Sequence, residues 1–357
     1  MQHDSINNLL LTHGEHKLTP EPYEELNLYS GNFKLKYTDF SVAVAPGLNM
    51  EVNRVYTSGV YSYDVKNFLN ENFLSSWHMG TAYIYEYTSK EACDREWCYS
   101  LLINTDGSIR EFIEAAEKPG WGKTRDNWSG DFPNNTFYDP KGIKYIFGHS
   151  VALNKHTKHF LTKVETPDGH WIQYHYDGVF INKITSSDPA KNIDISINKT
   201  KYSHTYCVQH CDWERKRRKY QTYYFPAPEN VYFNNKLIVS YDYTLGYEGG
   251  LLFLNTVTKS NGEIWRYGYE LYNLQSPISG VGDHTYRLQL SKVISPSGNI
   301  TEYKQEKDPD NQYSGRIYGI RLKSRNNNGI NNVMPAANWQ FNYTNGKDNN
   351  NVNTKIV

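Results

Sequence analysis

The side chains of this sequence that could do acid–base chemistry are carboxylates. Glycoside hydrolysis needs two of them, one as acid and one as base or nucleophile, and the candidate pairs are Glu111 with Glu114 and Asp126 with Asp131. Their spacing is also that of ordinary surface charges. The sequence has no phosphate-binding glycine loop, no serine nucleophile elbow and no His-Glu-x-x-His motif. We therefore predict no catalytic residues, no cofactor and no enzyme activity, with a cryptic glycoside hydrolase as the less favoured alternative.

Thiol and imidazole groups could instead hold a metal. The four cysteines form two pairs, Cys93 with Cys98 and Cys207 with Cys211, and His210 stands beside the second pair. Zinc accepts such ligands, so Cys207, His210 and Cys211 are candidates, but structural zinc sites usually have two intervening residues in each pair. Disulfides within or between the pairs and inert thiols fit the same residues. We predict no metal site, with these three residues as the weaker candidate.

The charges of the chain balance. Lys+Arg and Asp+Glu are both 38 and the sequence pI is about 7.2, which gives no general reason to expect nucleic acid or an anionic membrane as partner. The basic run Arg215–Lys219 could bind phosphate, a heparin-like polymer or an acidic partner, but such runs are more often solvated loops or edge strands. No segment approaches the ~18 apolar residues of a membrane span. We predict no nucleic-acid partner and no integral membrane segment.

The first residues lack the basic and apolar regions of a cleavable signal peptide. We therefore expect a cytoplasmic location before export, and secretion or delivery by a dedicated machine without such a peptide.

The elements that would position these side chains are strands. Aromatic residues make up 15% of the chain, with 31 Tyr against 14 Phe, and tyrosine suits strands that are half buried and half wet. Short alternating segments such as Phe33–Tyr37 and Asn49–Tyr56 recur between Gly, Pro, Asn and Asp clusters. The best helix candidate is the short stretch Val65–Phe73. The pattern predicts an all-β fold.

An internal repeat organises the second half of the sequence. Three segments superimpose without gaps: Leu161–Asp177, Leu254–Tyr269 and Leu290–Gln305. In each, a Leu is followed by a Val, a Gly and a Tyr at constant intervals. The Gly, preceded by Pro or Ser at the turn, supplies a positive φ, so each unit is predicted to be a β-hairpin. The signature positions are Gly169, Tyr174, Tyr176, Asp177, Gly262, Tyr267, Tyr269, Gly298 and Tyr303.

These units resemble the YD repeats of RHS proteins. Tyr174–Asp177, Tyr241–Tyr243 and Gly315–Ile317 carry the resemblance. The preceding region, over residues 28–80, resembles the segment that opens RHS proteins. The residues that match it are Ser30–Phe33, Thr38–Phe40, Pro46–Leu48, Arg54–Ser58 and Ser76–His78, with Asp39, Gly47, Arg54, Tyr56 and Trp77 as its signature.

The resemblance implies a long β-sheet of the kind that spirals into a hollow shell around a toxic polypeptide. Bacterial RHS toxins, Tc toxin B and C components and teneurins share this design. We therefore predict a curved antiparallel sheet of YD-type hairpins, forming an open half-shell or partial cocoon. Its expected parts are a polar tail or linker (1–24), an opening β segment (25–130), hairpin repeats (131–345) and the start of an incomplete further repeat (346–357).

The function implied by the resemblance is structural. The chain would be a non-catalytic scaffold that encloses, shields or delivers a cargo or toxin polypeptide in a virulence or interbacterial-competition system. Repeats of this kind bury their faces on their neighbours, so the last strand would be an open edge, capped by a partner chain, by self-association or by a local fold-back. The alternative is a carbohydrate-binding or adhesion module that uses exposed aromatic residues such as Trp171 and Trp265.

Overall fold

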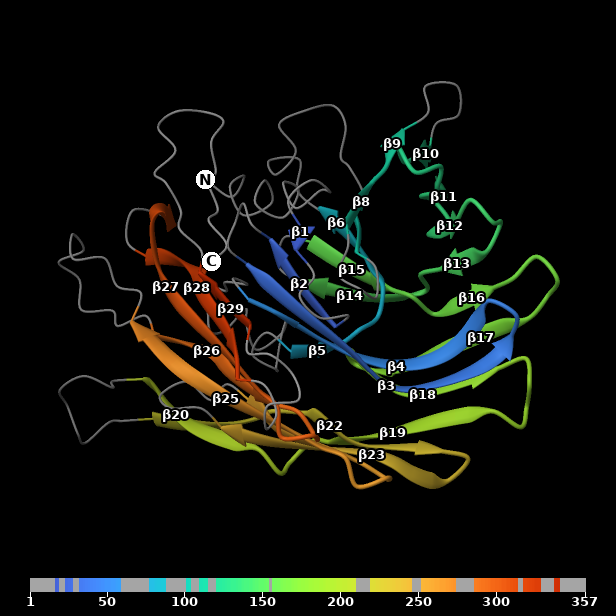
Figure 1. Cartoon of the computed structure of the whole chain (residues 1–357). Coiled ribbons are helices and arrows are strands. Elements are labelled where there is room, and N and C mark those ends of the chain that lie inside the picture. The colour runs from blue at the N-terminus through green and yellow to red at the C-terminus, as the bar shows by residue number, and fades with distance from the viewer. Residues whose placement is uncertain are drawn as a thin grey trace.

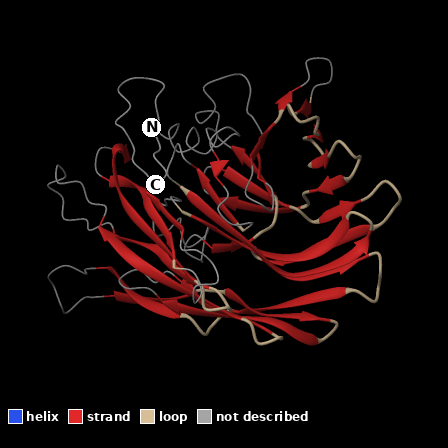
Figure 2. Cartoon of the chain, viewed as in Figure 1, coloured by secondary structure: helices blue, strands red, loops and turns tan. Residues whose placement is uncertain are grey.

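The computed structural model describes residues 17–18, 23–27, 32–58, 77–87, 101–103, 109–114, 120–153, 156–209, 219–245, 252–273, 286–313, 317–328 and 337–340. Every regular element in these ranges is a strand (Figure 2). The all-β prediction is therefore confirmed. The helix candidate Val65–Phe73, like the final segment 346–357, lies outside the described residues.

Most strands belong to one large antiparallel sheet. In order of pairing it contains β9 (Ile113–Glu114), β10 (Trp121–Lys123), β11 (Ser129–Asp131), β12 (Thr136–Tyr138), β13 (Lys144–Ile146), β16 (Lys163–Glu165), β17 (Trp171–Asp177), β18 (Phe180–Ser186), β19 (Asn192–Asn198), β22 (Ala227–Phe233), β23 (Lys236–Leu245), β24 (Leu252–Lys259), β25 (Ile264–Asn273), β26 (Tyr286–Ile294), β27 (Ile300–Tyr313), β28 (Ile317–Asn327) and β29 (Ala337–Gln340). No pairing between described residues joins β9 to β29, so the sheet does not close on itself.

The large sheet is strongly curved. In Figure 1 it passes from the green strands β10–β13 through β16–β19 to the orange strands β25–β28, and the blue strands of the chain's beginning cross its concave side. All three repeats lie in this one sheet, as strands β16–β17, β24–β25 and β26–β27. The structure thus confirms a curved antiparallel sheet that stays open.

The blue strands form a second sheet, which we call the opening sheet. Its strands are β1 (Lys17–Leu18), β2 (Glu24–Asn27), β3 (Phe33–Ala45), β4 (Leu48–Thr57) and β5 (Trp77–Met79). Strand β1 and the buried Glu24 lie in the stretch predicted to be a polar tail. Along β3, Phe33, Leu35, Tyr37 and Asp39 are buried in alternation, so one face of the sheet is directed at a core.

Two smaller sheets complete the described chain. The lateral sheet contains β14 (His149–Leu153), β15 (His156–Phe160), β6 (Tyr83–Tyr87), β7 (Leu101–Ile103) and β8 (Ile109–Glu111). Strands β20 (Ser203–Gln209) and β21 (Lys219–Tyr224) form a separate hairpin, the arm, on which Tyr220 and Tyr224 are exposed.

The repeat turns have the conformation that their glycines predict. Gly169, Gly262 and Gly298 have φ values of 88°, 88° and 85°, and each donates its N–H at 2.9 Å to the carbonyl three residues earlier. A Cβ on any of them would meet nothing within 4 Å. The left-handed backbone, and not a lack of space, therefore requires glycine.

In each repeat hairpin, the two strands pair with each other only close to the turn. The two strands pair over three residue pairs, and the outgoing strand then has a bulge in its pairing with the next strand. The residue seven after the turn Gly reaches back to the carbonyl of the opening Leu: Tyr176 Oη to Leu161 at 2.6 Å, Tyr269 Oη to Leu254 at 2.6 Å, and Gln305 Nε2 to Leu290 at 3.1 Å. Bulges bend and twist strands, so this recurring device curves the sheet without leaving that carbonyl unsatisfied.

Candidate functional site

The opening sheet and the large sheet meet at a buried ion pair. Arg54 of β4 donates from Nε to both carboxylate oxygens of Asp39 on β3, at 2.9 Å and 2.8 Å. The two side chains are 3% and 1% exposed. An isolated charge at this depth would cost several kcal/mol. The pair is tolerated because each charge neutralises the other and because further hydrogen bonds reach Asp39 Oδ2 and Arg54 Nη1.

Those further hydrogen bonds come from the large sheet. Tyr241 of β23 donates to Asp39 Oδ2 at 2.9 Å, and Arg54 Nη1 donates to the hydroxyl of Tyr267 on β25. Burial raises the pKa of both phenols above the usual value, so they remain neutral. Burial alone would lower the pKa of Arg54, but Asp39 and Tyr267 raise it. The guanidinium is therefore permanently charged and is shared between the two sheets.

Aromatic rings enclose the Arg54 guanidinium. Its carbon lies 4.3 Å from the ring centroid of Tyr37, 5.3 Å from that of Tyr267 and 5.6 Å from that of Trp77. Such contacts are worth about 2 kcal/mol or more when the cation is desolvated. Trp77 also donates from Nε1 to the Tyr269 hydroxyl at 2.9 Å. Tyr269 therefore joins the opening sheet to the backbone of its own repeat.

Tyr56 extends the junction to the third repeat. Its hydroxyl donates to Gln289 Oε1 at 3.1 Å and accepts the backbone N–H of Leu290 at 3.0 Å. Leu290 is the opening Leu of that repeat. Four of the five signature residues of the opening segment, all except Gly47, thus lie at one junction; Arg54, Tyr56 and Trp77 contact the repeats, and Asp39 contacts Tyr241 of β23.

A second buried ion pair joins the sheets further along. Arg325 of β28 donates from Nε to both carboxylate oxygens of Glu24 on β2, at 2.7 Å and 2.8 Å, across 301 residues of sequence. The side chains are 1% and 0% exposed. Beside the pair, Tyr303 of the third repeat stacks on Phe33 with the ring centroids 4.5 Å apart.

The first tyrosine of each repeat faces the opening sheet. Tyr267 bonds Arg54 and Tyr303 stacks on Phe33, as described above. Tyr174 is half-buried: loss of solvation raises its pKa, and the charge of Glu51 on β4 raises it further. Because these tyrosines occupy one position of the repeat, a single sequence pattern provides the surface that receives the opening sheet.

The remaining predicted residues lie elsewhere. Gly47 forms the β3–β4 turn with a φ of 77°. Asp177 pairs with the exposed Lys199 at 2.7 Å. Cys207 lies in β20, whereas His210 and Cys211 are outside the described residues. In the part of the chain that the structure describes, no three His, Cys, Asp or Glu side chains gather as a metal site. Nor is any helix there long and apolar enough to cross a membrane.

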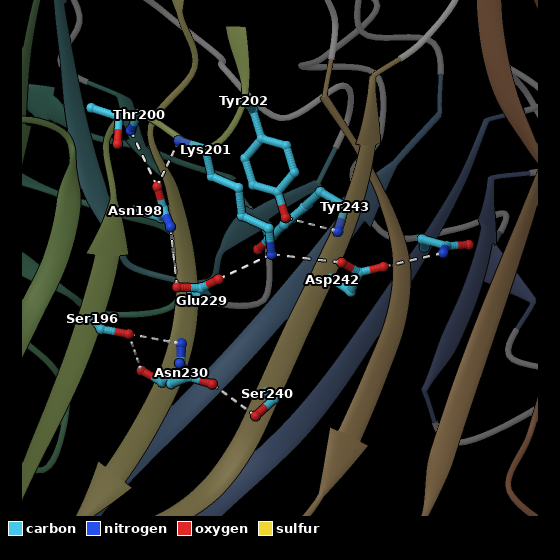
Figure 3. Close-up of polar contacts among 11 residues, drawn as sticks. Ser196, Asn198, Thr200, Lys201, Tyr202, Glu229, Asn230, Ser240, Asp242 and Tyr243 are labelled. Carbon is cyan, nitrogen blue, oxygen red and sulfur yellow. Dashed lines mark hydrogen bonds and ion pairs between the residues drawn. The ribbon is translucent and has the colours of Figure 1, made fainter.

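The opposite face of the large sheet carries a second, exposed cluster (Figure 3). Lys201 lies 3.0 Å from Glu229 of β22 and 3.9 Å from Asp242 of β23. Asn198 of β19 donates to Glu229 at 3.2 Å. The hydrogen bond between Lys201 and Glu229 is the largest cause of two pKa shifts. It lowers the pKa of Glu229 and raises the pKa of Lys201. We call this the outer cluster.

Beside the Arg54 pair an open cleft of about 390 Å³ separates the two sheets. Its lining includes Lys36, Tyr37 and Arg54 of the opening sheet and Lys259 and Trp265 of the second repeat. Two buried polar atoms in this lining, Arg54 Nη2 and Tyr37 Oη, have no hydrogen-bond partner.

Comparison with solved structures returns toxin components. The chain aligns with a TcdB2–TccC3 crystal structure at a TM-score of 0.41 and 9% identity, covering 94% of this chain and 21% of that one. It aligns with the Tc holotoxin pore of Photorhabdus luminescens at 0.39 and 10%, covering 89% and 19%. It also aligns with the N-terminal domain of the Salmonella typhimurium effector SpvB at 0.24 and 9%, covering 86% and 100%. The chain thus spans about a fifth of the Tc toxin chains.

No family model and no curated protein sequence matches the chain.

The sequence did not indicate Glu24, Arg325, Gln289 or Tyr241 as part of a junction. Glu24 stands at the end of a polar stretch, and Arg325 stands among serine and asparagine residues. A buried charge carries no local mark when its partner is hundreds of residues away. Only Tyr241 had a signal, because Tyr241–Tyr243 repeats the Tyr-x-Tyr spacing of the repeat units.

Proposed function

We propose that this chain is a non-catalytic β-shell segment of a toxin-type assembly, which encloses or presents a partner polypeptide. The observation that carries the proposal is the attachment of the opening sheet to the concave side of the large open sheet by two buried ion pairs. This arrangement supports a stiff, preformed wall. The toxin context rests on the RHS/YD resemblance of the residues that form the junction.

The absence of catalysis is part of the proposal. Of the carboxylate pairs that could serve a hydrolase, Asp126 accepts a hydrogen bond from Thr124, and Asp131 accepts one from Asn134 at 2.8 Å. Each carboxylate thus accepts a hydrogen bond from a nearby residue of its own turn. The side chains of Glu111 and Glu114 are outside the described residues. Export by a dedicated machine is likewise proposed, on the resemblance alone.

Protection of a partner from protease tests the proposal. The tagged full-length chain is co-expressed with the polypeptide encoded immediately downstream, purified, and treated with trypsin. We expect the partner to co-purify and to resist digestion, although it is degraded when expressed alone. A partner that never co-purifies, or that is equally resistant without this chain, would contradict the shell.

A matched pair of variants tests whether protection depends on the attachment of the opening sheet to the large sheet. Glu24→Ala detaches β2 from β28 and should expose the partner to trypsin. Glu229→Ala breaks an ion pair in the outer cluster, on the opposite face of the same sheet, and should leave protection unchanged. Equal loss in both variants would indicate general unfolding and not an opened shell.

A further inference from the structure

The cleft beside Arg54 contains hydrogen-bonding groups that the chain itself does not use. Arg54 Nη2 and Tyr37 Oη are both buried without a hydrogen-bond partner, and both residues line the cleft. A buried polar group without a partner costs about 1–3 kcal/mol, and native proteins rarely leave one unexplained. Both side chains line the cleft, so a partner for these two buried atoms would have to reach them from it.

The charge around the cleft favours an anion. Lys36 and Lys259 line it together with Arg54. The carboxylate within the lining, Asp39, already accepts from Arg54 Nε and Tyr241 Oη. Lys259 pairs with Glu263 at 3.4 Å, whereas no described residue forms an ion pair with Lys36. The unused groups are therefore a guanidinium N–H, a phenol O–H and an ammonium, all of which can donate to one oxygen anion.

Both ring faces of Tyr37 are already covered. Tyr37 stacks on Tyr23 with centroids 4.9 Å apart and contacts Trp265 at 4.8 Å. The Arg54 guanidinium lies 4.3 Å from the Tyr37 centroid. A sugar binds aromatic side chains by lying flat on an open ring face, and Tyr37 offers none. Donors without acceptors remain, so recognition at this cleft is by charge and hydrogen bonds.

We propose that this cleft binds a carboxylate carried by a polypeptide, the side chain of an acidic residue in the partner. A volume of about 390 Å³ has room for such a side chain together with several waters, at about 30 Å³ each. Placed against Arg54 Nη2 and Tyr37 Oη, the carboxylate supplies both with the missing acceptor. The assignment of the carboxylate to a polypeptide, and not to another molecule, rests on the proposed function. The existence of an anion site does not depend on that function.

Binding of small probes to the full-length chain tests the site. The probes are N-acetyl-glutamate amide, its neutral isostere N-acetyl-glutamine amide, and glucuronate, followed by calorimetry or by NMR at fixed ionic strength. We expect the glutamate probe to bind at least tenfold more tightly than the glutamine probe, and more tightly than glucuronate. Equal binding of the two amino-acid probes, or no binding of either at tens of millimolar, overturns the site. Tighter binding of glucuronate overturns the polypeptide assignment in favour of an acidic glycan.

Tyr37→Phe is the decisive variant, because it removes the hydroxyl and keeps the ring. We expect affinity for the glutamate probe to fall about tenfold, the size of one hydrogen bond to a charged group, while Tyr220→Phe on the exposed arm changes nothing. The unfolding temperature of the unliganded Tyr37→Phe protein should not fall. A fall would show that the hydroxyl is bonded within the chain, which also overturns the proposal.

The two proposals fail separately. A partner that co-purifies equally well with Tyr37→Phe and wild type removes the cleft from recognition and leaves the shell intact. Probe binding that is lost in Tyr37→Phe, in a chain that protects no partner, supports the site and contradicts the shell.

Discussion

Strand β23 contributes to two ionic clusters that lie on opposite faces of the large sheet. Tyr241 points inward and donates to Asp39 at 2.9 Å, within the Arg54 junction. Its neighbour Asp242 points outward, 3.9 Å from Lys201 in the outer cluster. The chemical groups are alike, but the Arg54 and Asp39 side chains are 3% and 1% exposed, whereas Lys201 and Asp242 are 44% and 52% exposed.

The difference in burial decides what each cluster does. Water and salt screen the outer charges, so either partner can be lost with little effect on stability. The inner side chains are almost fully buried, so each charge is acceptable only while its partner is present. The inner cluster thus specifies where the opening sheet must lie, and the outer one keeps an exposed sheet face soluble. Four predictions separate the two roles.

The largest expected effect is alkaline unfolding. Burial raises the pKa of eight inner tyrosines above the usual value: Tyr37, Tyr174, Tyr176, Tyr241, Tyr243, Tyr267, Tyr269 and Tyr303. The unfolded chain loses these protons from about pH 10, where the folded chain still keeps them. Their contribution to stability is therefore complete below about pH 10 and is lost as the pH rises toward the folded-state pKa values.

A titration followed at once by tyrosinate absorbance and circular dichroism checks this. We expect a cooperative step in which ionisation of the buried tyrosines coincides with loss of the β signal. Gradual ionisation of all tyrosines with the β signal intact would contradict the burial of the inner face.

Breaking the inner pair should cost the most among single substitutions. Arg54→Met leaves Asp39 charged and buried, and should lower the free energy of unfolding by about 3–5 kcal/mol. The double variant Asp39→Leu/Arg54→Met removes both charges and should recover much of that loss. Equilibrium urea unfolding followed by tryptophan fluorescence measures both. If the double variant is as unstable as the single one, packing and not the unpaired charge is responsible.

The hydroxyl of Tyr269 should have an intermediate effect. Tyr269→Phe removes the partner of both Leu254 O and Trp77 Nε1, which should cost about 1–3 kcal/mol. Tyr176→Phe, at the same position of the first repeat, loses the equivalent bond to Leu161 and a hydrogen bond with Thr81 in place of the one from Trp77. The two losses should therefore be similar, as measured by equilibrium urea unfolding. A Tyr269→Phe loss near zero would show that neither of its bonds contributes to the junction.

The outer cluster should have the smallest effect. Lys201→Met removes the ion pair with Glu229 and should cost below about 1 kcal/mol, and the difference should vanish in high salt. Lys201 lowers the pKa of Glu229, so its small contribution is present above the unfolded-state pKa of Glu229 and is lost as the pH falls through the folded-state value. A loss as large as that of Arg54→Met would contradict the contrast between the faces.

The sequence by itself determined the local structure of the repeats. Gly169, Gly262 and Gly298 specify three identical turns, because only glycine adopts their positive φ without strain. Alternation of apolar and polar residues specifies strands, and the Tyr-x-Tyr spacing places both tyrosines on one face. These features depend on neighbours within about 17 residues, so they can be read along the chain.

Only the tertiary structure decided what the inner faces meet. Asp39 and Tyr241 are 202 residues apart, and Glu24 and Arg325 are 301 apart, and nothing near either member of these pairs marks the other. Their contact depends on the curvature accumulated over many bulged hairpins, which brings the concave face around the opening sheet. Curvature is a property of the whole array, whereas each motif encodes one hairpin. The signature residues Asp39, Arg54, Tyr56 and Trp77 could therefore be singled out from sequence, but their partners, and both members of the Glu24–Arg325 pair, could not.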